Sequence, residues 1–185
     1  MLYQKKEDKF KRIVSSFLML AIAFCLCGCG GITDEAIDSL RQNGYEAERI
    51  DEYIFCISEG SAKYYFSKGV FRPVLRTVVY IIPKENEDIF DRDLQLIVEI
   101  TKGRRNRMSI RFTDAYVRKK ATGEQYVDNR VEYFTFKKDF SPENLTNNRG
   151  FHDVRGDYEY YLNKYTTSDE LLMIYNRGLE IEKDL

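Results

Sequence analysis

The middle of the chain constrains the fold most, because it repeats one β-sheet pattern three times. Apolar and polar side chains alternate over residues 94–100, 107–113 and 126–136. Such alternation is typical of strands that bury one face. Two short polar turns, residues 102–106 and 119–124, separate the runs. Because strands joined by short turns pair with their neighbours in opposite directions, the sequence predicts an antiparallel β-meander.

The segment before the meander favours a further strand. Residues 74–82 are rich in β-branched side chains and lie between Pro73 and Pro83, a composition typical of strands. Residues 47–57 fit either a helix or a strand, and we favour the helix because apolar residues recur at helical spacing. Residues 62–71 are ambiguous in the same way.

Helix signals lie near both ends of the chain. Thr33, followed by two acidic residues, predicts the start of a short helix that ends near Gly44. Residues 141–143 also predict a helix start, with a loop over residues 146–156 and a short helix over residues 157–165. The order Thr167-Ser-Asp-Glu170 is a capping box that opens a final helix.

Together these signals predict an α+β fold. We expect one antiparallel β-meander sheet of four to six strands. The N- and C-terminal helices would pack on one face of this sheet.

The N-terminal segment has the order of a secretory signal. Five basic residues precede an apolar run, Ile13–Leu26, of 14 residues. This run is shorter than the roughly 20 residues of a membrane-spanning helix. It ends in Leu26-Cys27-Gly28-Cys29, which resembles the lipobox of bacterial lipoproteins. In such proteins the last cysteine of the box carries the lipid and becomes the first residue.

The lipobox resemblance implies a division of the chain. Residues 1–28 would be the removed signal peptide, residues 29–32 a tether lipidated at Cys29, and residues 33–185 one extracytoplasmic domain. Two acyl chains on Cys29 would hold the protein stably at the outer side of the cell membrane. An uncleaved anchor and ordinary secretion are the alternatives, and both also place the domain outside.

Removal of the signal changes the composition. It takes away five basic and two acidic residues and moves the formal net charge from −1 to about −4. This weakly acidic balance argues against nucleic acid as a partner. Cys56 would be the one unmodified cysteine left, which excludes a disulfide within the domain, and its apolar neighbours predict burial.

Signals of catalysis are weak. His152 is the single histidine, and no Gly-x-Ser-x-Gly turn is present to hold a nucleophile. Asp88, Asp91 and Asp93 lack the spacing of a calcium-binding loop. The sequence therefore predicts neither an enzyme nor a metal or cofactor site, although a pair of carboxylates brought together by folding would permit a hydrolase.

Basic side chains near the two turns form a candidate contact surface. They are Arg104, Arg105, Arg107, Arg111, Lys119 and Lys120. Successive turns of a meander lie at opposite ends of the sheet, so we expect two separate patches. They could contact an anionic surface or an acidic protein partner. Alternatively, they protect turns and strand edges from aggregation.

The C-terminal third carries a second resemblance. The run Tyr158-Glu-Tyr-Tyr-Leu-Asn-Lys-Tyr165, followed by the capped helix and preceded by a β-meander, resembles the TipC family. These are immunity proteins that neutralise secreted toxins outside the membrane of Gram-positive bacteria. Members usually carry a transmembrane helix where this chain has a lipobox, and the resemblance assigns no functional residue.

The resemblance implies a non-catalytic, outward-facing binding domain, with immunity as its most concrete form. A wall- or lipid-active hydrolase and a structural envelope lipoprotein remain the alternatives.

Overall fold

A computed structural model of the chain describes residues 31–69, 72–84, 94–102, 107–146 and 154–185. The strands are β1 (Glu46–Arg49), β2 (Ile54–Glu59), β3 (Ala62–Ser67), β4 (Val74–Pro83), β5 (Gln95–Lys102), β6 (Met108–Lys119) and β7 (Gln125–Phe136). The helices are α2 (Asp34–Gln42), the short 3-10 helix η2 (Pro142–Asn144), α3 (Val154–Lys164) and α4 (Ser168–Asp184).

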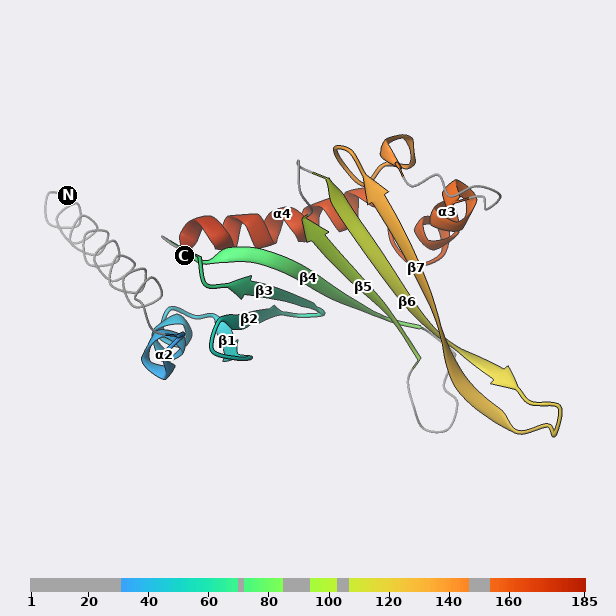
Figure 1. Ribbon diagram of the computed structural model, residues 1–185, viewed down its shortest axis with the longest axis horizontal. Coiled ribbons are helices and arrows are strands. Elements are labelled where there is room, and N and C mark those ends of the chain that lie inside the picture. Colours follow the sequence, from blue (N-terminus) through green and yellow to red (C-terminus); the bar gives the residue numbers. More distant parts are fainter. Residues whose placement is uncertain (1–30, 70–71, 85–93, 103–106, 147–153) are drawn as a thin grey trace, which may run out of the picture. The chain divides into compact units, whose positions relative to one another are not determined.

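The strands form one open antiparallel sheet in which the spatial order follows the chain from β1 to β7 (Figure 1). This confirms the predicted α+β class and the antiparallel meander. The predicted strand count was too low, because the sheet has seven strands rather than four to six. The additional strands lie at the N-terminal side, where the sequence pattern was ambiguous.

The helix predicted over residues 47–57 is wrong. This segment contains most of β1, a turn and the first part of β2, and the two strands pair in antiparallel register. The carboxylate of Asp51 accepts hydrogen bonds from the backbone N–H groups of Tyr53 and Ile54, at 2.7 and 2.8 Å. Such an aspartate turn reverses the chain and gives it an alternative to helical hydrogen bonding.

The predictions for the other helices are largely confirmed. The Thr33 hydroxyl accepts a hydrogen bond from the Ala36 N–H at 3.2 Å, and Thr167 caps the Glu170 N–H at 3.1 Å. Residues 154–156 were predicted as loop but lie in the first turn of α3, whose buried residues Tyr158 and Tyr161 come after Gly156. The start predicted at residues 141–143 leads only to the short η2.

The chain divides into two compact units. The first comprises the described parts of Met1–Glu59, Tyr65–Leu75 and Leu179–Leu185. Within it, α2 buries Ile37 and Leu40, and the rings of Phe55 and Phe66 stack at 5.3 Å. Cys56 is buried, as predicted from its apolar neighbours.

The second unit comprises Gly60–Tyr64 and Arg76–Gly178, which include most of β4, all of β5–β7 and α3. One face of β5–β7 is apolar and buried. Its fully buried side chains are Leu96, Val98, Ile100, Ile110, Phe112, Phe134 and Phe136. Helix α3 packs on this inner face: Tyr161 stacks on Phe112 with ring centroids 4.4 Å apart, and Tyr158 lies 5.0 Å from Phe134.

A buried ion pair lies on the same inner face. The ammonium group of Lys84 pairs with the carboxylate of Asp114, and their side chains are 3% and 11% exposed. Lys84 also donates a hydrogen bond to the backbone carbonyl of Ala115 and lies 5.6 Å from the ring centre of Tyr165. This pair joins the end of β4 to the middle of β6. Each buried charge is neutralised by the other, so removing one would leave an uncompensated charge in the interior.

Tyrosine hydroxyls on the inner face are withdrawn from water. Burial raises the pKa of Tyr158, whose hydroxyl donates a hydrogen bond to the carbonyl of Phe140 at 2.7 Å. The Tyr80 hydroxyl donates to the Glu170 carboxylate at 2.8 Å, and burial first and this carboxylate second raise its pKa to about 12. These bonds tie the inner face to the segments that cover it.

Candidate binding face

The opposite face of β4–β7, here called the open face, presents three rows of side chains. Register across the strands aligns Thr77, Thr101, Ser109 and Thr135 in the first row, Val79, Glu99, Arg111 and Tyr133 in the second, and Ile81, Ile97, Thr113 and Val131 in the third. All of these side chains are half-buried or exposed. The open face is thus a mixed surface of hydroxyl groups, one charged pair and β-branched carbons.

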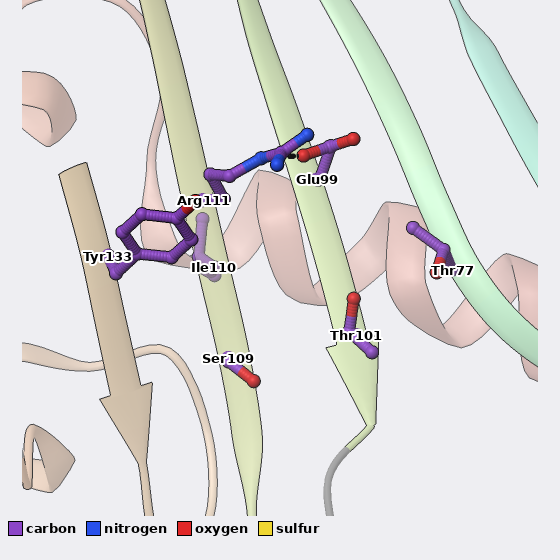
Figure 2. A pocket seen from close by; sticks show the side chains of 7 residues that line it. All are labelled: Thr77, Glu99, Thr101, Ser109, Ile110, Arg111 and Tyr133. Carbon is purple, nitrogen blue, oxygen red and sulfur yellow. Dashed lines mark ion pairs between the residues drawn. The ribbon is translucent and has the colours of Figure 1, made fainter. Parts of the chain in front are cut away.

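A groove of about 370 Å³ lies over the first two rows. Its lining residues are Thr77, Glu99, Thr101, Ser109, Ile110, Arg111 and Tyr133. Figure 2 shows Tyr133, Arg111 and Glu99 side by side across three neighbouring strands, β7, β6 and β5. The groove is therefore built on regular strands, whose paired backbones fix the positions of its side chains.

The charge in this groove is balanced. The guanidinium of Arg111 forms an ion pair with Glu99 (Figure 2). Contact with Tyr133 first, and with Glu99 second, raises the pKa of Arg111 further above its ordinary value. Tyr133 itself is 59% exposed, so its ring is available to a ligand while Arg111 supports one side of it.

Such a groove is chemically suited to binding. Tyrosine and arginine are enriched at the centres of protein interfaces, because they combine large contact area with hydrogen bonding. The threonine and serine hydroxyls can donate or accept hydrogen bonds. Within the described ranges, no group of three or more His, Cys, Asp or Glu side chains could hold a metal ion.

The structure separates the predicted basic residues. Arg107 and Arg111 lie toward one end of β6, and Lys119 and Lys120 at the other. Arg111 is paired with Glu99, and Lys120 is paired with Glu124 at 2.8 Å. The described basic side chains therefore form two separate groups, as expected, and acidic neighbours offset part of their charge.

Several predicted residues lie outside the described residues. They are Cys29, Arg104, Arg105 and the considered candidates His152, Asp88, Asp91 and Asp93. Among the helices that the structure describes, none has the length and apolar character needed to cross a membrane.

Sequence reasoning missed Glu99, Tyr133 and the hydroxyl row. Each belongs to the polar side of an alternating strand. The alternation predicts that these side chains are exposed, but it does not predict which side chains of neighbouring strands lie next to one another. Only the strand register places Glu99, Arg111 and Tyr133 next to one another.

Comparison with known proteins gives no match: no family model, no curated protein and no solved structure is significantly similar to this chain.

Proposed function

We propose that this protein is a membrane-anchored bacterial lipoprotein whose outward-facing domain binds another protein without catalysing a reaction. The observation that carries the proposal is the open face, where Arg111, Glu99 and Tyr133 line a groove on a rigid sheet. The most concrete form of this function is immunity, in which the partner is a secreted toxin.

The inner and open faces differ in a way that supports a binding role. Tyr158 and Tyr161 of α3 cover the inner face, whereas Tyr133 and Val131 on the open face are exposed. Because α3 covers the inner face, the open face of β4–β7 is the one that remains available to a partner.

The proposed membrane anchor is the lipid attached to the lipobox cysteine, Cys29. Lipid attachment requires the thiol of Cys29, so Cys29→Ser should abolish both lipidation and processing at this site. Metabolic labelling with an alkyne fatty acid, followed by gel analysis of the membrane fraction, measures both effects. Cys56→Ser is the matched control and should label like the wild type. A Cys29→Ser protein that still labels and matures would contradict the lipoprotein assignment.

Binding through the open face can be tested with one bulky substitution in the groove. Thr101→Arg places a long charged side chain beside Arg111, where repulsion and lost space should reduce partner capture at least tenfold. The full-length tagged protein in its membranes is mixed with the culture medium of the producing bacterium, and captured proteins are identified by mass spectrometry.

The control is Thr122→Arg, which makes the same change at an exposed position in the turn between β6 and β7. It should capture the partner as the wild type does. Equal capture by the two variants, or capture of no protein by the wild type, would argue against this function. Protection of a toxin-sensitive strain by the wild type but not by Thr101→Arg would support the immunity form.

A further inference from the structure

Strand β7 is the last strand of the sheet, and the direction of its backbone groups can be read from two hydrogen bonds. The carbonyl of Thr135 accepts a bond from the Thr146 N–H at 2.7 Å, on the side away from β6. The Asn129 N–H bonds the Asp128 side chain at 2.9 Å. Because alternate residues of a strand direct their backbone groups to the same side, Val127, Asn129 and Val131 all present theirs to the outer edge.

Little protects this edge among the described residues. A bridge between Phe136 and Leu145 covers only its C-terminal end. Val127 and Val131 are 39% and 44% exposed, and both lie on the open face. Long edges with exposed β-branched side chains are templates for pairing with another strand.

The first half of β7 also belongs to a part of the sheet that is only two strands wide among the described residues. Strand β5 pairs with β6 only as far as Asp114, so residues 115–119 of β6 pair with residues 125–129 of β7 alone in the described chain. This ribbon extends beyond the neighbouring strands in Figure 1. Two-stranded ribbons are marginally stable in water, so a third strand along β7 would stabilise this one.

We propose that β7 pairs with β7 of a second copy of this chain, in antiparallel orientation about a two-fold axis at Asn129. In this register Val127 lies opposite Val131 of the second copy, and each such pair can exchange two backbone hydrogen bonds. At the axis, the Asn129 N–H exchanges its local bond to the Asp128 side chain for one to the Asn129 carbonyl of the second copy. Asp128 lies opposite Arg130 of the second copy, so opposite charges meet twice across the axis. The two open faces then continue into one another on the same side of a wider sheet.

Charge and free backbone groups favour this register over the registers with the axis at a neighbouring residue. An axis at Asp128 or at Arg130 would place identical charges opposite each other, which is destabilising. An axis at Val131 would require the outer backbone of Thr135, which Thr146 already occupies. An axis at Val127 would use only the first residues of the strand and leave Val131 outside the pairing.

The two charged residues are already held at this edge. Arg130 pairs with Glu132 at 2.7 Å and with Asp157 at 3.2 Å, and Asp128 pairs with Arg118 at 3.0 Å. Their positions along the strand are therefore restricted before a second copy arrives, which lowers the entropy lost on association.

Cross-linking of the full-length protein in its native membranes tests the proposal. Asn129 lies opposite itself, so oxidation of Asn129→Cys with copper phenanthroline should give a covalent dimer. The control is Gln125→Cys on the same strand, because two copies of this residue would lie roughly 27 Å apart. We expect at least tenfold less dimer from the control. A second variant adds Val127→Lys and Val131→Lys to Asn129→Cys and places lysines opposite each other at both valine pairs.

Strand edges tolerate lysine, so this variant should keep the folded circular dichroism spectrum while its dimer yield falls at least tenfold. Absence of a dimer from Asn129→Cys would overturn the proposal. Equal yields from Asn129→Cys and Gln125→Cys, an unchanged yield in the lysine variant, or cross-links to a different protein would also overturn it. None of these readouts depends on the open-face groove.

Discussion

Replacing Lys84 by Met should lower the free energy of unfolding by about 3–5 kcal/mol, which makes it one of the most damaging single changes in this chain. The substitution leaves the carboxylate of Asp114 in a buried position without its compensating charge. It also removes the hydrogen bond to the Ala115 carbonyl. Thermal and urea unfolding followed by circular dichroism measure the loss, since the chain contains no tryptophan for fluorescence.

The double substitution Lys84→Met with Asp114→Leu separates the two causes of this loss. If the cost comes from the isolated carboxylate, removing it should restore much of the stability, because an apolar pair can replace a buried ion pair of similar volume. A double variant as unstable as the single one would show that Lys84 acts through packing against Tyr165 instead.

Phe112→Ala should lower the free energy of unfolding by about 3–5 kcal/mol, because it empties the centre of the aromatic cluster on the inner face. Phe112 is fully buried, stacks on Tyr161 at 4.4 Å and meets the edge of Phe134 at 5.7 Å. The loss combines the transfer of a large side chain with the cavity that it leaves. Chemical denaturation of the purified protein measures it.

Val131→Ala on the opposite face is the control for this prediction. Its side chain is 44% exposed, so its loss should change stability by no more than about 0.5 kcal/mol. Similar losses for the two variants would contradict the assignment of the inner and open faces.

Much of the second unit could be predicted from sequence, because its strands are long and alternate cleanly. The pattern over residues 94–136 predicts β5, β6 and β7, and the two prolines delimit β4. The capping box predicts the start of α4 to within one or two residues. In each case the signal is local, and it agrees with the tertiary packing.

The N-terminal strands could not be assigned in the same way. Strands β1 and β2 are four and six residues long, too short for either periodicity to dominate. The deciding contact is the Asp51 carboxylate on the N–H groups of Tyr53 and Ile54. Several aspartates in this chain could form such a turn, and sequence alone does not indicate which one does.

The binding face was harder to predict than the fold, because it depends on register between strands. Arg111 was identified as a candidate from the basic residues around it. Its partners Glu99 and Tyr133 lie on different strands, and a shift of one residue in either pairing would place them on the inner face. The position of the groove therefore follows from turn lengths as much as from its own residues.

The order in which the chain is synthesised bears on the aromatic cluster. Phe112, Phe134 and Phe136 leave the ribosome before Tyr158 and Tyr161, which cover them. A nascent chain that ends before Val154 contains the apolar residues of the meander but not the helix α3 that buries them. Folding of this unit therefore cannot be completed until the C-terminal helices emerge from the ribosome. For an exported protein of the kind proposed, this delay would keep the chain unfolded, and thus competent for translocation, until its synthesis is almost finished.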